Sequence, residues 1–325
     1  MDTDTRISRY LKDIEYNYEE IVALQVDASR RKYFRISHKN NSAILVDSSL
    51  EKTSLIDFHK MSLWLKSQGY SSPKIYNVNF KKGLSIMEDF GNNKFSSFFL
   101  NNKKNEYSIY LETIRLLLDL SKKKRPDFLR NFSKNVLFRE LSIFLDWHNY
   151  YKREKKKNEI SEWNLIWDNL FNIALKDKKK SVVLRDFHID NLFLLKKRKG
   201  IKRIGLIDFQ DALFGHPCYD LVSLLQDVRV NIPKRKEYKL LDAYLSCYSG
   251  SRENFKQSYL ILGTQRLIKI IGIFKRLEYL QKKKVYLNYL PRTWKLLNGN
   301  LKHPLFRDLN LWFKSYREKY TRLLR

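Results

Sequence analysis

Hydrophobic and polar residues alternate over several short stretches within the first 90 positions of the chain. Such alternation is typical of strands that bury one face. The pattern predicts five strands, at residues 21–26, 32–37, 42–46, 75–80 and 84–87. Apolar residues recur at helical spacing over residues 50–68, after the third strand, and an amphipathic stretch at residues 5–19 precedes the first. We therefore expect a five-stranded sheet that begins as an antiparallel meander, with one helix inserted after its third strand.

Longer helical patterns dominate the chain after residue 90. They cover residues 107–122, 134–151, 160–175, 217–227, 236–248 and 253–281. No internal repeat and no linker rich in Gly, Ser or Pro divides the chain, so the change of pattern near residues 88–93 is the expected boundary. The sequence predicts an α+β protein with a small antiparallel lobe at residues 1–90 and a larger, mainly helical lobe at residues 91–325.

A strand-like segment interrupts the helical half and carries an unusual group of polar residues. After an apolar run at residues 182–184, four polar side chains occur within six positions, those of Asp186, His188, Asp190 and Asn191. A packed strand does not need such a group. For each aspartate taken singly, the ordinary interpretation is a turn or cap residue. His188 has no partner at metal-binding spacing, so we expect it to be structural.

The residues that follow predict a β-hairpin. Its arms, residues 192–195 and 204–208, flank a basic turn and have similar lengths, so they should bring Asn191 and Asp208 together. An amide oxygen beside a carboxylate suits Mg²⁺ bridging to substrate phosphates, and Asp186, five residues before Asn191, lies within reach as a base. Together these residues favour phosphoryl transfer to a hydroxyl.

Composition and charge narrow the class of protein. The chain has 325 residues, 43% of them hydrophobic and 14% aromatic, which is enough for a buried core. Lys and Arg number 64 against 35 Asp and Glu, a formal net charge of +29. The basic residues occur mainly in short runs typical of turns and helix ends, without an RNA-binding motif, which favours solvated surface charge over a nucleic-acid partner. That charge would also attract an anionic nucleotide.

The two cysteines, Cys218 and Cys247, support neither a disulfide framework nor a zinc site, which fits a cytoplasmic protein. We expect no signal peptide and no membrane span, because the first residues lack an apolar stretch after a basic one. The most apolar segment, residues 259–274, is interrupted by Gln265, Arg266 and Lys269.

Three motifs together resemble the signature of the aminoglycoside phosphotransferase and choline kinase superfamily. They are DFHIDN at residues 186–191, IDFQDA at residues 207–212 and GHPCYDL at residues 215–221. The resemblance implies a two-lobed, protein-kinase-like fold that uses ATP and Mg²⁺. By motif, Asp186 corresponds to the catalytic base, Asn191 and Asp208 to the Mg²⁺ ligands, and Asp220 to a carboxylate at a helix start that braces the catalytic loop.

Further stretches are similar to a bacterial subgroup that includes the anomeric N-acetylmuramate/N-acetylglucosamine kinases of cell-wall recycling. They are residues 27–35, 263–266, 272–274 and 290–294. This similarity implies a small-molecule kinase that phosphorylates the anomeric hydroxyl of an amino sugar. We expect Asp190, Gln210, Asp211 and Arg266 to line the acceptor site beside Asp186, although Gln210 and Asp211 can equally cap the turn after the hairpin.

The resemblance also implies where the nucleotide binds. Residues 27–31 correspond to the turn over the phosphates, where Ser29, Arg30 and Arg31 would make contacts, and Glu88 lies in the hinge that binds adenine. The alternative is an ordinary basic hairpin turn, since no GxGxxG or P-loop pattern is present. The third strand lacks the usual phosphate-binding lysine. Arg31 and Lys32 are the nearest replacements, unless the chain is a degenerate kinase.

Several alternatives remain open at this point. An aminoglycoside or choline phosphotransferase of the same superfamily would need an acidic site for its cationic substrate, and the basic helical lobe argues against one. A catalytically weak pseudokinase could bind nucleic acid through its basic surface. A protein kinase is disfavoured because no His-Arg-Asp motif is present and no Asp-Phe-Gly follows the catalytic segment, where residues 207–210 read IDFQ. Neither the identity of the acceptor nor the oligomeric state can be read from the sequence.

Overall fold

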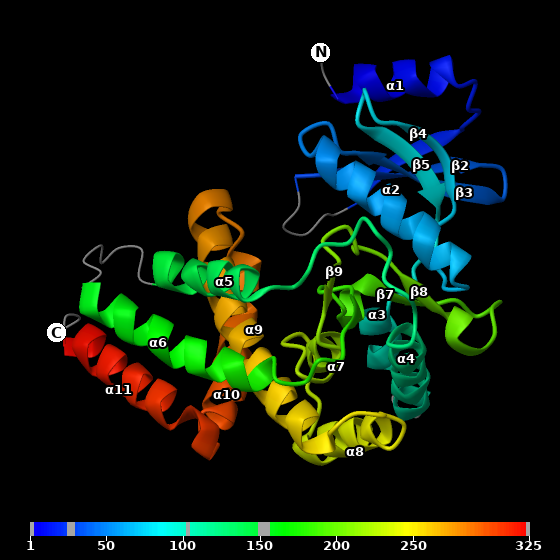
Figure 1. Ribbon diagram of the computed structural model, residues 1–325. Helices are drawn as coiled ribbons and strands as arrows, with labels where there is room; N and C mark the ends of the chain where they lie inside the picture. The colour runs from blue at the N-terminus through cyan, green and yellow to red at the C-terminus, as the bar shows by residue number, and fades with distance from the viewer. Residues whose placement is uncertain (1–2, 25–29, 102–104, 149–156, 323–325) are drawn as a thin grey trace. The chain divides into compact units, whose positions relative to one another are not determined.

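The computed structural model describes residues 3–24, 30–101, 105–148 and 157–322 (Figure 1). The chain forms two compact units. The first consists of Met1–Lys103 and Asp190–Ala212, and the second of Lys104–Ile189 and Leu213–Arg325.

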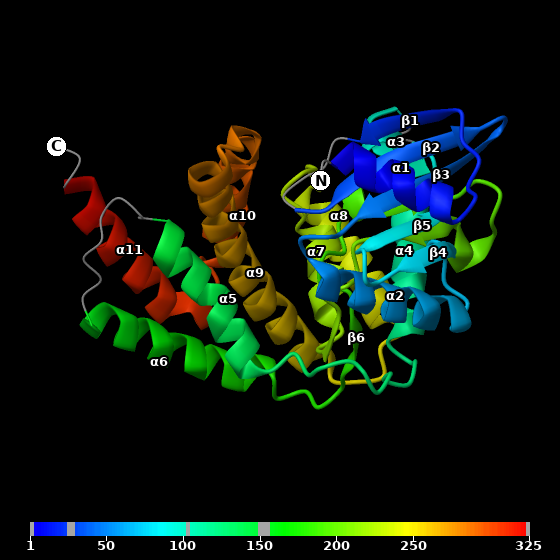
Figure 2. The ribbon, with the colours of Figure 1, turned by 90° about the horizontal axis from the view of Figure 1, so that it is seen from above.

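The first unit is built on a five-stranded antiparallel sheet in the order β1-β2-β3-β5-β4. The strands are β1 (Glu20–Leu24), β2 (Lys32–His38), β3 (Asn41–Asp47), β4 (Ile75–Asn79) and β5 (Leu84–Glu88). Helix α1 (Thr3–Asp13) precedes them and α2 (Lys52–Ser67) follows β3. The sheet lies between these two helices (Figures 1 and 2).

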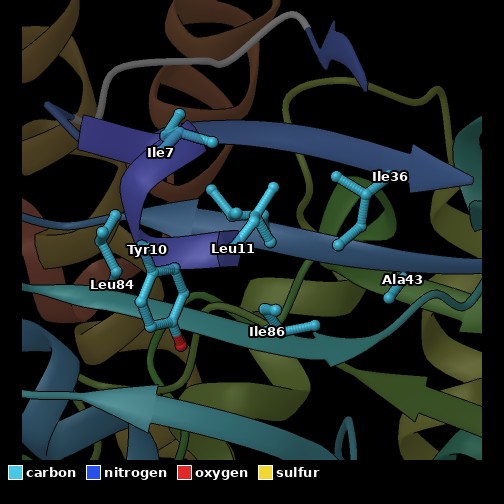
Figure 3. Packing of buried hydrophobic residues seen from close by; sticks show 8 residues of the cluster. Ile7, Tyr10, Leu11, Ile36, Ala43, Leu84 and Ile86 are labelled. Atoms are coloured by element: carbon cyan, nitrogen blue, oxygen red, sulfur yellow. The ribbon is translucent and has the colours of Figure 1, made fainter. Parts of the chain in front are cut away.

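Both faces of the central strand are buried, as expected for a sheet covered on two sides. One face, with Ala43 and Leu45, packs in a cluster with Ile7 and Leu11 of α1 (Figure 3). Ile44 alternates to the opposite face and is also buried. Helix α2 buries the side chains of Leu55, Phe58, Met61, Ser62 and Leu65.

A hairpin from the middle of the sequence completes the first unit. Strands β7 (Leu192–Leu194) and β8 (Ile204–Leu206) pair in antiparallel register. Leu206 donates its backbone N–H to the Ser71 carbonyl at 2.8 Å, and Leu194 donates to the Asn93 carbonyl at 2.8 Å. These bonds explain why the unit also includes α3 (Phe95–Asn101) and extends beyond residue 90.

The second unit is mainly helical and is organised around α9 (Arg252–Gln281). Its other helices are α4 (Glu106–Leu120), α5 (Lys134–Trp147), α6 (Lys157–Ala174), α7 (Cys218–Leu225), α8 (Lys234–Leu245), α10 (Leu290–Asn300) and α11 (Arg307–Arg322). Helices α5, α6, α7 and α10 all pack on α9. Gly272 permits the close approach of α5, because a Cβ there would lie 2.6 Å from the Phe144 nitrogen. Strands β6 (Ser181–Val183) and β9 (Leu213–Gly215) form a small antiparallel pair.

The α+β prediction is confirmed, with the five predicted strands in one antiparallel sheet and a helix at each of the predicted helical patterns. The amphipathic stretch noted at residues 5–19 is helical only in its first part: α1 ends at Asp13, and Glu15 adopts the left-handed φ of 53°. The sequence reading missed α3, α10, α11 and β9. No helix among the described residues is long and apolar enough to cross a membrane. Cys218 is buried, Cys247 is exposed, and both are free thiols.

Candidate active site

In the first unit, the hairpin brings Asn191 and Asp208 together. Asn191 directly precedes β7, and one residue separates Asp208 from the end of β8. The pairing of Leu192 with Leu206 therefore brings the two side chains close together. The Asn191 side-chain amide donates to Asp208 Oδ2 at 3.2 Å. Asp208 has a left-handed φ of 60°, an uncommon conformation for a residue with a side chain. The equal arms predicted from the sequence therefore do place these two side chains in contact.

A cation from the sheet pairs with the same carboxylate. Arg31 is buried and donates from Nη2 to Asp208 Oδ1 at 2.8 Å. Its Nε lies 3.8 Å from Glu51 Oε2, just before α2. Gln210 also donates to Asp208 Oδ1, at 3.0 Å. Burial acts to lower the pKa of Arg31, but the neighbouring Tyr33 and Asp208 raise it overall, so this guanidinium is firmly cationic.

The side-chain oxygens of Asn191 and Asp208 fit a magnesium ion whose remaining ligands would be substrate phosphates and water. Mg²⁺ is commonly bound by one or two protein oxygen ligands together with phosphates and water. Asp208 supplies a carboxylate, and Asn191 supplies an amide oxygen because its nitrogen faces Asp208. In the described part of the chain, no three His, Cys, Asp or Glu side chains gather as a self-sufficient metal site. Asn191 and Asp208 together fit a magnesium ion, to which they would supply two oxygen ligands.

In the second unit, two buried carboxylates hold the loop that carries Asp186. Asp220, in the first turn of α7, accepts the backbone N–H groups of Leu184 at 2.6 Å and Arg185 at 2.9 Å. Asp227 accepts the N–H of Ile189 at 3.1 Å. Arg185 has a left-handed φ of 70°, which costs conformational energy and is sustained by these bonds. Burial raises the pKa of Asp220 to about 7, against the lowering effect of the two backbone hydrogen bonds.

The motif suggests that Asp220 braces the catalytic loop, and its two hydrogen bonds to the loop backbone are compatible with that prediction. Asp227 plays the same part at the other end of the loop and was missed by the sequence reading. It is the last residue of the helix predicted at residues 217–227, where an acidic residue is easily taken for a surface group, whereas α7 ends at Leu225.

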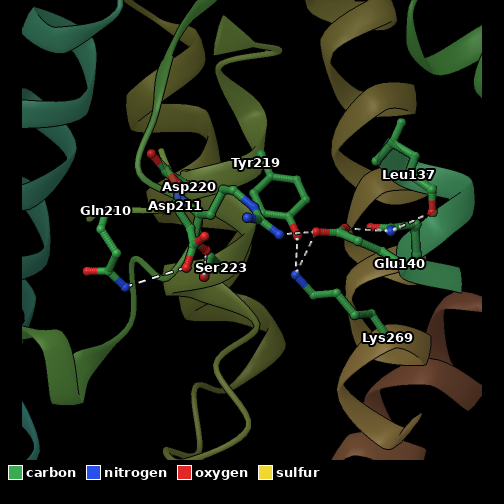
Figure 4. Close-up of polar contacts among 10 residues, drawn as sticks. Leu137, Glu140, Gln210, Asp211, Tyr219, Asp220, Ser223 and Lys269 are labelled. Atoms are coloured by element: carbon green, nitrogen blue, oxygen red, sulfur yellow. Dashed lines mark hydrogen bonds and ion pairs between the residues drawn. The ribbon is translucent and has the colours of Figure 1, made fainter. Parts of the chain in front are cut away.

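A buried charged network extends from this loop to α5 and α9 (Figure 4). Glu140 of α5 pairs with Arg185 and accepts from Gln265 at 2.9 Å and Lys269 at 3.3 Å. Lys269 also donates to the Tyr219 hydroxyl at 3.0 Å. Burial raises the pKa of Glu140, but Lys269 and Arg185 lower it below its usual value. Only the interruption of an apolar helix by Gln265 and Lys269 hinted at this network in the sequence.

The remaining predicted residues are distributed over both units. In the first, Glu88 pairs with Arg198 and accepts the Lys74 N–H at 3.1 Å, and Gln210 lies 3.5 Å from Asp211. Asp190 lies in the short helical turn Ile189–Asn191. Arg30 is exposed, and Ser29 lies outside the described residues. In the second unit, His188 and Arg266 are both buried.

Comparison with known proteins identifies relatives along most of the chain. Residues 20–253 match the model of the phosphotransferase enzyme family. A protein of Caulobacter vibrioides named N-acetylmuramate/N-acetylglucosamine kinase is 31% identical over 272 residues, which cover 80% of this chain and 74% of the relative. One of Pseudomonas aeruginosa with the same name is 28% identical and covers 86% of this chain and 82% of the relative.

Solved structures with the same fold include two kinds of small-molecule kinase. Choline kinase LicA from Streptococcus pneumoniae aligns with a TM-score of 0.65 and 16% identity over 91% of this chain and 99% of that structure. The ADP-bound aminoglycoside phosphotransferase APH(2'')-Ib aligns with a TM-score of 0.63 and 15% identity over 94% of this chain and 99% of that structure. These similarities confirm the kinase-like fold. Since the family model spans most of the chain and the Caulobacter relative supports it over four fifths of the sequence, the chain belongs to the phosphotransferase enzyme family and transfers phosphoryl groups to an alcohol acceptor.

Proposed function

We propose that the chain is an ATP- and Mg²⁺-dependent kinase of a cell-wall amino sugar, N-acetylmuramate or N-acetylglucosamine. The observation that carries the proposal is the shared name of four curated relatives, which are 25–31% identical to the chain over at least 80% of its length. We further propose that it acts in the cytoplasm, where ATP is available, as a step of cell-wall recycling.

Asp186 is the proposed catalytic base. Phosphoryl transfer asks for little covalent chemistry from the protein, so positioning of the acceptor hydroxyl and stabilisation of charge supply most of the rate. Asp186 would orient that hydroxyl and take its proton as the bond to phosphorus forms. The bonds from Asp220 and Asp227 to the flanking backbone support this role, because they fix the loop before substrate binds.

Asn191 and Asp208 are the proposed metal ligands. When bound, Mg²⁺ would neutralise charge on the transferring phosphates. Arg31 would keep the Asp208 carboxylate oriented and add positive charge beside the phosphates, which is the part that the missing third-strand lysine plays in related kinases. The proposed nucleotide-binding lobe comprises residues 1–90, with Arg30, Arg31, Glu88 and Ser29 as contacts.

The first test is acceptor-dependent ADP formation from ATP and Mg²⁺. We expect turnover with N-acetylmuramate and N-acetylglucosamine, and turnover at least about 100-fold weaker with choline or an aminoglycoside, because the basic second unit disfavours cationic acceptors. Preferred turnover of choline or the aminoglycoside would overturn the amino-sugar assignment. ATP binding without turnover of any acceptor would instead favour the pseudokinase alternative.

A charge-removing variant tests the proposed role of Arg31. Arg31→Met is expected to lower kcat/KM for ATP by about 10- to 100-fold with little change in KM for the sugar, since a charge-assisted contact to Asp208 is lost. Lys60→Met removes the same charge from the exposed face of α2 and should leave both constants within about twofold. Steady-state kinetics with varied ATP distinguishes the two variants. Equal losses of kcat/KM for ATP in both would contradict the role proposed for Arg31.

A further inference from the structure

Arg266, on α9 in the second unit, is a buried cation that none of the described carboxylates binds directly. Its side chain is 4% exposed. Its guanidinium makes no hydrogen bond or ion pair with any residue that the structure describes, and Nη1 is completely buried. An unpaired charge removed from water costs several kcal/mol, and arginine cannot relieve that cost by losing its proton. Such a group is expected to have an anionic or strongly accepting partner in the working protein.

The surrounding carboxylates are already used. Glu140 binds Arg185, Gln265 and Lys269 (Figure 4). Asp220 attracts Arg266 electrostatically, but its two oxygens accept backbone N–H groups of the loop. Among the described residues, the cluster therefore holds two cations that share the Glu140 carboxylate, Arg185 and Lys269, and a third, Arg266, that Asp220 attracts without an ion pair.

Arg266 lies near Asp186, the proposed catalytic base, because both interact with Asp220. Asp220, which interacts with Arg266, bonds to the loop directly before Asp186 and is influenced by the Asp186 charge. Lys269, one helical turn from Arg266 on α9, is influenced by the same charge. An acceptor held for attack at Asp186 would thus bring its substituents close to this part of α9.

We propose that Arg266 binds a carboxylate of the acceptor and thereby selects acidic amino sugars over neutral ones. This inference rests on the proposed sugar-kinase function. A guanidinium offers two parallel N–H donors that match a carboxylate, which gives orientation as well as binding energy. N-acetylmuramate carries a carboxylate that N-acetylglucosamine lacks, so the two acceptors differ by the group that Arg266 would recognise.

The test compares acid and neutral ligands on wild type and on Arg266→Met and Arg266→Lys. Isothermal titration measures binding of N-acetylmuramate, its methyl ester and N-acetylglucosamine, and kinetics measures kcat/KM for each. In wild type the acid should bind about 10- to 100-fold more tightly than the ester, the range expected for a charge-assisted contact. In Arg266→Met this preference for the acid should disappear, because the KM for N-acetylmuramate rises. The kcat/KM for N-acetylglucosamine should change by less than about threefold. Arg266→Lys should keep part of the preference.

Each result decides the inference. Equal binding of acid and ester by wild type would overturn it, and this comparison does not depend on whether a variant folds. Equal losses of affinity for all three ligands in Arg266→Met would also overturn it, since an arginine with a merely structural role would affect the binding of every acceptor alike. Lys275→Met, which removes a partly exposed charge from α9, should leave the preference intact. If no sugar is phosphorylated while the acid still binds preferentially, the proposed function fails and the carboxylate site stands.

Discussion

Asp186→Asn is expected to lower kcat for sugar phosphorylation by about 10³-fold, with the KM for ATP within about threefold of wild type. The substitution keeps the size of the side chain but removes the oxygen that accepts the hydroxyl proton, and general base catalysis commonly contributes about 10²- to 10⁴-fold. ATP binding should persist, because Asp186 belongs to the second unit and the proposed nucleotide contacts belong to the first. Initial rates with saturating ATP measure the effect.

The matched control for Asp186→Asn is Asp127→Asn, which removes an exposed carboxylate from the same unit. Its kcat should equal that of wild type. If Asp186→Asn keeps more than about a tenth of the wild-type kcat, Asp186 is not the base. In that case the motif would have identified a loop residue whose role is structural.

The sheet could be predicted because local pattern and burial agree there. Strand β3 alternates side chains that are buried against two helices, and the following helix has the expected apolar period. Short elements were missed because their own residues hardly specify them. Strand β9 has three residues and exists through pairing with β6, and α3 has seven residues, too few to be stable by themselves. Helix α10 has Pro291 in its first turn, where proline is favoured, but that start signal was not used in the prediction.

The difference between local pattern and long-range packing also explains which contacts of the site could be predicted. Asn191 and Asp208 are 17 positions apart on one hairpin, so equal arms were enough to predict their contact. Arg31 reaches Asp208 across 177 positions, and Lys269 reaches Glu140 across 129. Contacts at such separations depend on how helices and strands pack, which periodicity within one segment does not contain. The sequence singled out Asp186 and its loop as the proposed chemical centre, but not the buried groups that hold the loop.

The largest expected loss of stability comes from removing the centre of that buried network. Glu140→Met should lower the free energy of unfolding by about 3–5 kcal/mol, because Lys269 remains buried with an uncompensated charge and Arg185 loses this carboxylate as a partner. For a unit of this size, we expect the midpoint of thermal unfolding to fall by about 6–20 °C. Circular dichroism during heating and denaturant titration both measure the change.

Two further variants separate the buried charge from other causes of instability. Glu278→Gln breaks a partly exposed pair with Lys275 on the same helix and should cost less than about 1 kcal/mol. The double variant Glu140→Met with Lys269→Met removes the stranded ammonium, so it should be more stable than Glu140→Met alone. If it is no more stable, the loss arises from altered packing at position 140 rather than from the unpaired charge. A Glu140→Met protein that unfolds like wild type would show that the loop carrying Asp186 does not need the network.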